Sequence, residues 1–398
     1  MNVRRWLAIG AVAVATVATL GTLPATADRP DLNPAEQSLG ALGLRHNLYL
    51  GTAVDMAALN DAADPHYREI VGSEFTSVTA ENVMKWESLE PTRGTYNWAP
   101  ADELVAFAKR NNQRVRGHVL VWQNQLPAWL TEGVADGSID REELRTILRN
   151  HITTVVRHFK GRIWQWDVVN EAVSDPWDDP PTLHYKGFWA QHLGPGYIAD
   201  AFRWARAADP HALLFYNDYN IEAFGSGDAA NDKTQFVYNM AKELLRAGVP
   251  IDGVGSQGHL GTQYPNYDTL QVVDALRKFA RLGLATAFTE VDVRSQLTDG
   301  VRAGDSAEVN PRLQASAANF HVLLQACLAE RRCLSFTVWG FTDKHSWVPG
   351  WFDDPPEGLA TIYDENYQPK RAYNVMRADL IYAGPPYVLP RLPQRPRR

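Results

Sequence analysis

The chain repeats one pattern, a short apolar segment that ends in polar residues and is mostly followed by a longer amphipathic stretch. The short segments, rich in apolar and β-branched residues, span Tyr49 to Val54, Ser77 to Asn82, Arg114 to Trp122, Ile163 to Glu171, Leu213 to Asn220, Gly253 to Leu260, Ala285 to Asp292 and Phe336 to Asp343. Strand followed by helix, repeated along a chain, predicts a parallel sheet whose crossover connections are helices. Eight such units are enough to close a barrel.

The amphipathic stretches between these segments have apolar residues three and four positions apart, which predicts helices with one buried face. These stretches span Ala101 to Asn111, Arg141 to Phe159, Lys233 to Ala247 and Tyr267 to Leu282. An open doubly wound sheet is the alternative arrangement, but no glycine-rich phosphate-binding turn follows the first strand. We therefore predict an α/β fold, a TIM (β/α)8 barrel.

The first residues have the layout of a secretory signal peptide. Arg4 and Arg5 precede an apolar run, and Ala25-Thr26-Ala27 fits the small-residue rule for cleavage. A transmembrane anchor would need a longer apolar run. The paired arginines leave twin-arginine export open beside the general secretory route. We expect a secreted, extracellular protein that has no membrane association after cleavage.

The 398 residues suit one large barrel, since such barrels span roughly 200 to 400 residues. We divide the chain into a secretory signal peptide (1–27), an N-terminal linker (28–39), a (β/α)8 catalytic domain (40–382) and a Pro/Arg-rich disordered tail (383–398). The tail is assigned by composition, because it has too few apolar residues to build a core.

Charge and cysteine content limit the partners and the compartment. The 46 acidic residues outnumber the 39 basic ones, so no broad basic surface is available for nucleic acid. The only cysteines are Cys327 and Cys333, and export would carry them to a compartment where a disulfide persists. We expect one bridge closing a short loop, with two free buried thiols as the alternative, and we expect a monomer.

Two glutamates stand where two predicted strands end. Glu171 follows Asn170 at the end of one apolar run, and Glu290 follows Thr289 at the end of another. A solvated loop is the common place for a glutamate, but a barrel puts its catalytic loops directly after its strands. Cleavage of a glycosidic bond needs a carboxylic acid for the leaving oxygen and a second carboxylate on the other face of the sugar. The pair therefore suggests a glycosidase.

Polar and aromatic side chains collect at the other predicted strand ends. They are Glu81, Asn82, Lys85, Trp86, His118, Trp122, Gln125, Asn217, Asp218, Tyr219, Asn220, Gln257, His259, Asp292 and Trp339. Sugars stack on aromatic faces, and their hydroxyl groups need flanking donors and acceptors. The histidines lack the spacing of a metal site on one element, so we expect no metal and no cofactor.

Several motifs resemble glycoside hydrolase family 10, whose typical members are secreted, retaining endo-β-1,4-xylanases on a (β/α)8 barrel. The resemblance covers roughly residues 40 to 380. Its motifs are Thr79 to Trp86, Gly117 to Trp122, Trp166 to Ala172, Tyr216 to Asn220, Gln257 to His259, Thr289 to Asp292 and Thr337 to Phe341. The resemblance implies xylan as the substrate and double displacement through a covalent glycosyl-enzyme as the mechanism.

The resemblance also implies roles for individual residues. Glu171 would be the acid/base and Glu290 the nucleophile, with Asn170 on the sugar 2-hydroxyl. His259 and Asp292 would support the nucleophile, and Cys327 with Cys333 matches a loop disulfide of the family. Substrate contacts would come from Glu81, Asn82, Lys85, His118, Trp122, Gln125 and Gln257, from Trp339 and Trp347 above them, and from Tyr219 and Asn220 on the aglycone side.

One position departs from the family pattern. Gln123 stands directly after Trp122, where the family usually has histidine. An amide can donate and accept hydrogen bonds but cannot carry the positive charge of an imidazolium, which leaves the substrate preference open. The alternatives are a retaining β-glycosidase of the same fold acting on β-glucan, β-1,3-xylan or a plant glycoside, and a catalytically silent glycan-binding barrel.

Overall fold

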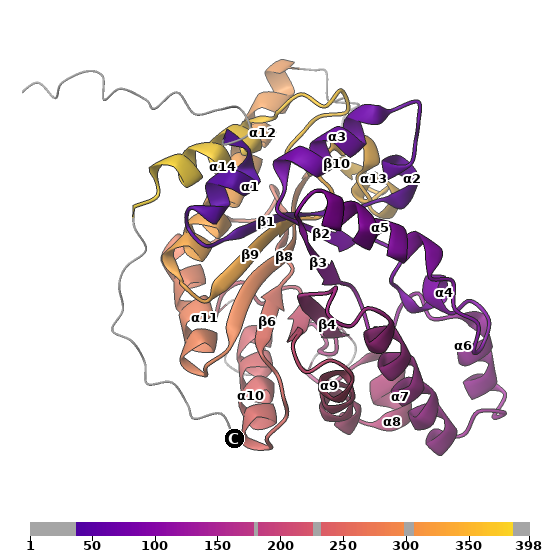
Figure 1. Ribbon diagram of the computed structural model, residues 1–398. Coiled ribbons are helices and arrows are strands. Elements are labelled where there is room, and N and C mark those ends of the chain that lie inside the picture. The colour runs from indigo at the N-terminus through magenta and orange to yellow at the C-terminus, as the bar shows by residue number, and fades with distance from the viewer. Residues whose placement is uncertain (1–36, 179–181, 226–231, 298–305, 385–398) are drawn as a thin grey trace, which may run out of the picture.

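A closed parallel barrel forms the centre of the protein, and it confirms the predicted fold (Figure 1). The computed structural model describes residues 37–178, 182–225, 232–297 and 306–384. Within these ranges the barrel strands are β1 (Tyr49–Val54), β2 (Ser77–Ala80), β3 (Arg114–Gly117), β4 (Gln165–Asn170), β5 (Leu213–Asp218), β6 (Gly253–Ser256), β8 (Ala285–Gln296) and β9 (Cys333–Val338). Neighbouring strands pair in parallel, and β9 pairs with both β8 and β1, which closes the ring.

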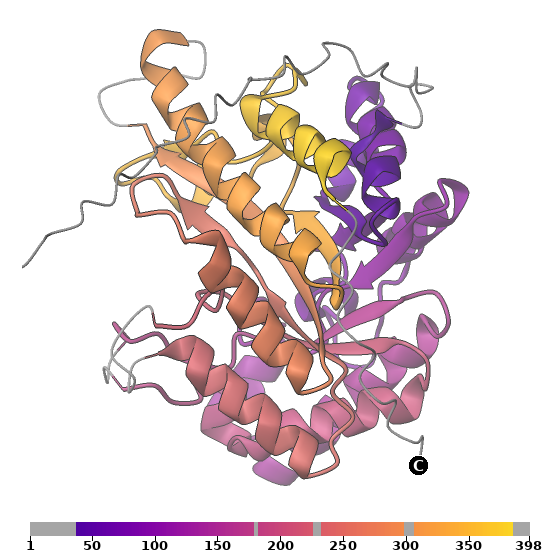
Figure 2. The same ribbon diagram turned by 90° about the vertical axis from the view of Figure 1, so that its left-hand side faces the viewer.

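Helices surround this ring on its outside (Figures 1 and 2). The longer ones are α3 (Pro65–Glu74), α5 (Ala99–Arg110), α6 (Ala128–Ala135), α7 (Arg141–His158), α9 (Gly196–Ala208), α10 (Lys233–Arg246), α11 (Thr269–Arg281), α12 (Ser306–Ala329) and α14 (Arg371–Tyr382). Shorter elements are α1 (Leu39–Leu44), α2 (Met56–Leu59), α4 (Trp86–Leu89), α8 (Gly187–Leu193), α13 (Val348–Trp351), the 3-10 helix η3 (Asp343–His345), β7 (His259–Gly261) and β10 (Glu357–Gly358).

Local sequence signals explain where several outer helices begin and which face they bury. Asp140, Asp232 and Asp268 cap α7, α10 and α11 by accepting hydrogen bonds from backbone N–H groups of the first turn. In α11 the buried residues Val272 and Leu276 recur at helical spacing and face the barrel. The strands are buried on both sides, as a parallel sheet covered by helices requires.

A buried charged cluster fills part of the barrel interior in place of branched apolar side chains. Arg116 donates from Nε to Asp167 Oδ2 at 3.0 Å and from Nη1 to Gln165 Oε1 at 2.7 Å. Its guanidinium also lies over the Phe215 ring. All of these polar groups are at most 2% exposed, so each needs its partner to offset the cost of leaving water.

The observed strands differ from the predicted ones mainly at their ends. β1 matches its prediction, but β2 and β3 end before Asn82 and Trp122 because the chain turns away to form the loops above the barrel. The predicted sixth strand is interrupted at Gly258, whose φ of +77° cannot continue a strand, and resumes as β7. β8 continues to Gln296 because β7 and β10 pair with its extension.

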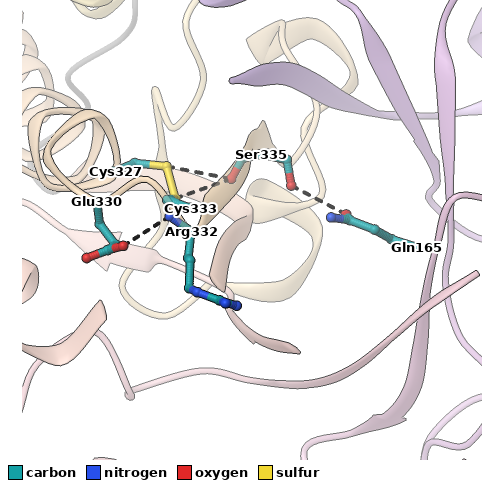
Figure 3. Close-up of a disulfide and its surroundings, with 6 residues drawn as sticks. All are labelled: Gln165, Cys327, Glu330, Arg332, Cys333 and Ser335. Carbon is teal, nitrogen blue, oxygen red and sulfur yellow. Dashed lines mark hydrogen bonds between the residues drawn. A yellow bond between two sulfur atoms is a disulfide. The ribbon is translucent and has the colours of Figure 1, made fainter. Parts of the chain in front are cut away.

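The disulfide expected from the sequence is present between Cys327, near the end of α12, and Cys333, the first residue of β9 (Figure 3). Cys333 pairs with Thr286 at the start of β8, so the bridge lies at the N-terminal end of the strands. Among the described residues no helix is both long and apolar enough to cross a membrane. The predicted signal peptide (1–27), most of the linker and most of the tail lie outside the described residues.

Candidate active site

Glu171 directly follows β4 and is held by neutral hydrogen-bond donors only. Trp122 Nε1 donates to Oε2 at 2.8 Å, and the amide of Gln123 lies 3.5 Å from the same oxygen. Gln257 Nε2 and Asn170 Nδ2 donate to Oε1 at 2.9 and 3.1 Å. None of these four contacts is an ion pair, so they orient the carboxyl group of Glu171 without placing a full positive charge against it.

Glu290 lies within β8 and has two histidine neighbours instead. His259 Nε2 is 3.4 Å from Oε2, and His118 Nδ1 is 4.0 Å from Oε1. Burial alone would raise the pKa of the Glu290 carboxyl, but the two histidines outweigh burial and lower that pKa below its usual range. A lowered pKa favours the ionised form of Glu290.

Asp292 contacts the ring nitrogen of His259 that does not face Glu290. His259 Nδ1 lies 2.9 Å from Asp292 Oδ2, and Trp347 Nε1 donates to the same oxygen at 2.8 Å. Burial works against a charged imidazole, but Asp292 and then Glu290 raise the pKa of His259 to about 10. His259 is thus a cation between two carboxylates, and its protonated form fixes the orientation of Glu290.

The amide side chains of Asn170 and Asn217 form a chain of hydrogen bonds between Glu171 and Glu290. Asn217 Nδ2 donates to Glu290 Oε1 at 2.7 Å and lies 2.9 Å from Asn170 Oδ1. Asn170 in turn contacts Glu171, while Thr289 Oγ1 donates to Asn217 Oδ1 at 2.7 Å and fixes that amide. In the sequence, Asn217 is only one of several polar residues at predicted strand ends. Its contact with Glu290 joins two strands that are far apart in the chain, so the sequence alone does not indicate it.

The loop after β2 places the polar side chains of Glu81, Asn82 and Lys85 beside Glu290, and we call this group the polar wall. Lys85 Nζ donates to Asn82 Oδ1 at 3.0 Å and lies over the Trp122 ring. Burial lowers the pKa of Lys85, although Glu290 and Glu81 act in the opposite direction. Burial, and then the charge of Asp55, raises the pKa of Glu81 to about 7. The structure thus brings Glu81, Asn82 and Lys85 together, as predicted.

Gln125 belongs to the same wall. Its Nε2 donates to Glu87 Oε1 at 3.0 Å and lies 3.4 Å from Asn82 Oδ1. Gln125 is also one of the few non-glycine residues with a positive φ, 47°, which turns its side chain back toward the β2 loop. Of the two glutamines predicted to line the site, Gln125 is the more exposed, whereas Gln257 is buried beneath Glu171.

The predicted aromatic residues surround the histidines. The Trp339 ring packs edge-on against His118, with ring centroids 5.2 Å apart, and Trp347 packs against His259 at the same separation. Trp339 is only 7% exposed. His118 is buried as well, and its Nδ1 lies 3.0 Å from Asp167 Oδ2 of the interior cluster. His118 therefore lies near both Glu290 and Asp167.

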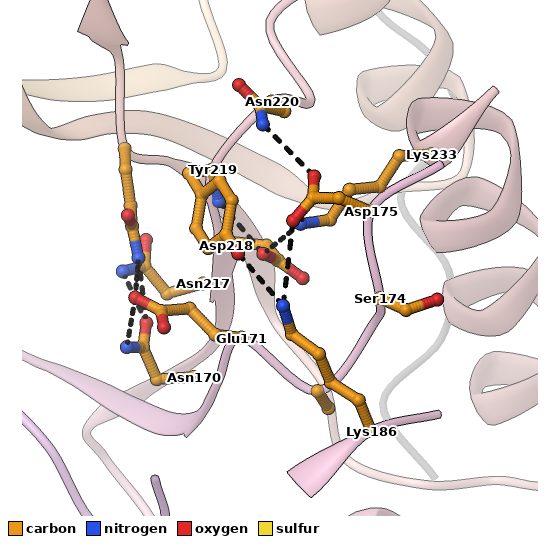
Figure 4. Close-up of polar contacts among 12 residues, drawn as sticks. Asn170, Glu171, Ser174, Asp175, Lys186, Asn217, Asp218, Tyr219, Asn220 and Lys233 are labelled. Atoms are coloured by element: carbon orange, nitrogen blue, oxygen red, sulfur yellow. Dashed lines mark hydrogen bonds and ion pairs between the residues drawn. The ribbon is translucent and has the colours of Figure 1, made fainter. Parts of the chain in front are cut away.

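Tyr219 and Asn220, expected to contact substrate, belong to a charged cluster beside Glu171 (Figure 4). Lys186 Nζ donates to the Tyr219 hydroxyl at 2.9 Å, and Lys233 lies 3.7 Å from the centre of the Tyr219 ring. Asn220 Nδ2 donates to Asp175 Oδ1 at 3.0 Å, so part of its hydrogen-bonding capacity is used within the protein. Lys233 could not be assigned to this cluster from the sequence, since it is the first residue of a predicted helix.

The donor set is suited to acid–base and nucleophilic chemistry at a sugar. Among the described residues no group of three or more histidine, cysteine or acidic side chains could hold a metal ion. The site offers one carboxyl group among neutral donors and one among cations, with amides and tryptophans around them. Two titratable groups whose surroundings differ in this way can divide the acid and base roles of one reaction.

Comparison with known proteins agrees with this chemistry. The sequence profile of glycosyl hydrolase family 10 matches residues 38–379. The chain is 42% identical over 341 residues to endo-1,4-beta-xylanase B of Thermotoga neapolitana, covering 85% of this chain and 90% of that protein. It is 37% identical to an endo-1,4-beta-xylanase of Agaricus bisporus, covering 82% and 89%.

Solved structures give the same result. The crystal structure of xylanase 10B from Thermotoga petrophila RKU-1 in complex with xylobiose is 40% identical, with a TM-score of 0.77, covering 86% of this chain and 97% of that one. Native xylanase 10B from Thermotoga maritima is 41% identical, with a TM-score of 0.75 and coverage of 86% and 98%.

Proposed function

The chain belongs to glycosyl hydrolase family 10, and we propose that it is a secreted endo-β-1,4-xylanase that hydrolyses internal bonds of xylan with retention of configuration. The observation that carries the proposal is the contrast between Glu171 and Glu290, which share one site in opposite surroundings. Relatives that cover most of the chain are named as endo-1,4-beta-xylanases, which supports xylan as the substrate.

In the proposed first step, Glu290 attacks the anomeric carbon and Glu171 protonates the leaving oxygen. Glu290 suits the role of nucleophile because its lowered pKa keeps it ionised at neutral pH. Glu171 is assigned the role of acid from its place in the motif Trp166 to Ala172, and it lies at hydrogen-bond distance from Trp122 and Gln257. The product of this step is a covalent glycosyl-enzyme on Glu290.

In the second step, Glu171 acts as the base toward water. Once Glu290 is esterified, its negative charge is gone, so Glu171 loses a nearby anion and ionises more easily. His259 and Asp292 remain to receive Glu290 as a carboxylate when the ester is cleaved. Asn170 lies between the carboxylates and is assigned to the sugar 2-hydroxyl, where a bond that strengthens in the transition state lowers the barrier.

The remaining residues are assigned to substrate binding. On the glycone side the proposed contacts are Glu81, Asn82, Lys85, His118, Trp122, Gln125, Gln257, Trp339 and Trp347. Of these, Trp122 and Gln257 donate to Glu171, Lys85 donates to Asn82, and Trp347 donates to Asp292. Tyr219 and Asn220 are assigned to the aglycone side, and Figure 4 shows Tyr219 near Glu171.

Secretion rests on the first part of the chain, whose signal-peptide layout is a feature of the sequence. Purified protein should be tested on β-1,4-xylan beside carboxymethyl cellulose, with reducing ends followed over time and the first products analysed by NMR. Short xylo-oligosaccharides formed first as β anomers would support the proposal. Activity confined to cellulose or to small glycosides would overturn the substrate, and first products of α configuration would overturn retention.

A further inference from the structure

The backbone on both sides of the Glu171 side chain is tied to the neighbouring strand β5. Glu171 has a φ of +56°, a conformation that residues with a Cβ adopt rarely and that neighbouring contacts must maintain. Its own N–H donates to Asn217 O at 2.9 Å. The next N–H, that of Ala172, donates to the Tyr216 hydroxyl at 3.2 Å. A tyrosine side chain therefore holds the peptide group that follows Glu171.

Asp218 orients the Tyr216 hydroxyl so that its oxygen can accept the hydrogen bond from the Ala172 N–H. The hydroxyl has one proton, which it donates to Asp218 Oδ2, so an oxygen lone pair is left for the Ala172 N–H. Both Tyr216 and Asp218 are fully buried, and no solvent competes for these bonds. Burial, followed by the charge of Asp218, raises the pKa of Tyr216, so the hydroxyl keeps its proton.

Lys233 fixes Asp218 from the opposite side. The Lys233 side chain is 2% exposed, and its ammonium group lies 2.9 Å from Asp218 Oδ1 and 3.3 Å from Asp175 Oδ1 (Figure 4). Asp175 belongs to the loop that follows Glu171. The cation therefore ties that loop to the end of β5 at a second point, beyond Ala172.

We propose that Tyr216, Asp218 and Lys233 are positioning residues that hold the acid/base carboxyl of Glu171 toward the leaving oxygen. The inference rests on the proposed function, because it assigns these residues to that reaction. They do not touch substrate in this account. They fix the strained backbone from which Glu171 projects, and a displacement of its carboxyl group slows the steps that need proton transfer.

The side chain to change is Tyr216, because Tyr216→Phe removes only the hydroxyl. Two substrates separate positioning from general stability. Xylotetraose needs protonation of its leaving group, whereas 2,4-dinitrophenyl β-xylobioside has a leaving group that departs without it. We expect kcat/KM for xylotetraose to fall at least fivefold, while kcat/KM for the aryl glycoside stays within twofold of the wild type.

Tyr67→Phe is the matched control. Tyr67 is buried, and its hydroxyl accepts the Asp55 N–H at 3.0 Å, the same kind of bond at another place in the barrel. The control should lose stability comparably and leave the ratio of the two kcat/KM values unchanged. Asp218→Asn is a second variant. With its Oδ1 facing Lys233, its amide group would face Tyr216 and leave the hydroxyl proton without its acceptor, so the variant should shift the ratio in the same direction.

An equal loss on both substrates in Tyr216→Phe, or an unchanged ratio in a folded variant, would overturn the positioning role. The wild type separates this result from a failure of the proposed function. A wild-type enzyme without activity on xylotetraose would contradict the xylanase assignment itself, whereas an active wild type with equal losses in the variant would contradict only the inference.

Discussion

Glu171 follows β4 and Glu290 lies within β8 of the same barrel, and their surroundings differ in charge. Glu171 is held by the indole of Trp122 and by amides, all of them neutral, whereas Glu290 faces a cationic His259 supported by Asp292. Neutral donors orient a carboxyl group without preventing protonation as strongly as a cation would. Since the two side chains are chemically identical, the different roles proposed for them must come from the residues that surround each carboxyl group.

Removing the nucleophile gives the largest expected effect. Glu290→Ala should lower turnover by on the order of 10⁴-fold or more on every substrate, because no covalent intermediate can form. The measurement is kcat/KM on xylotetraose and on the dinitrophenyl xylobioside. Substantial activity of this variant on either substrate would remove the contrast between the two carboxylates.

The acid/base variant should behave differently from the nucleophile variant. Glu171→Ala should lose on the order of 10² to 10⁴-fold on xylotetraose, the usual contribution of general acid catalysis. The formation of the glycosyl-enzyme from the dinitrophenyl substrate should be nearly unchanged, and added azide should restore turnover by attacking that intermediate. Equal losses on the two substrates, with no response to azide, would contradict the assigned role.

The charge of His259, which distinguishes the surroundings of Glu290, can be measured through the pH dependence of stability. The pKa of His259 is raised from 6.5 to about 10 in the folded protein, so its charge stabilises the fold fully below pH 6.5. This contribution is lost as the pH rises through about 10. The unfolding free energy of the wild type should therefore fall between pH 6.5 and 10, and His259→Asn should lack that part of the fall.

Denaturant unfolding at several pH values across this range measures the difference. If the unfolding free energies of the wild type and His259→Asn change with pH in parallel, the pKa of His259 is not raised in the folded protein. The control is the stability below pH 6, where the two proteins should differ by the full contribution of the ion pairs.

The smallest expected effect comes from the other end of the barrel. Replacing Cys327 and Cys333 by serine should lower stability by about 2 kcal/mol, because a short loop restricts the unfolded chain only modestly. The ratio of activities on the two substrates should not change, since the bridge lies at the N-terminal end of the strands. Thermal unfolding with and without reductant tests the first point, and an unchanged melting temperature would contradict it.

The sequence predicted the barrel because its strands and helices have different periods and because polar residues end the strands. Strand ends were harder to predict, since Asn82 follows β2 in a polar loop and Trp122 follows Val119 to Val121, an apolar run that lies in a loop. The break at Gly258 depends on a positive φ that glycine permits but does not require.

Side-chain partners in the site could be predicted only in part. Glu171, Glu290, His259 and Asp292 could be named because local motifs contain them. Lys233 could not, since a lysine at the start of a helix is usually solvated and its burial depends on two distant aspartates. Pairings across strands and loops follow from tertiary structure, which one sequence does not display.

The most direct test of the central claim is to trap the covalent intermediate. Purified protein would be incubated with 2,4-dinitrophenyl 2-deoxy-2-fluoro-β-xylobioside, whose fluorine slows hydrolysis of the glycosyl-enzyme more than its formation. Intact mass and peptide mapping would then locate the label. We predict one 2-fluoroxylobiosyl group, attached to Glu290, and a label on Glu171, or no label on an active enzyme, would contradict the account.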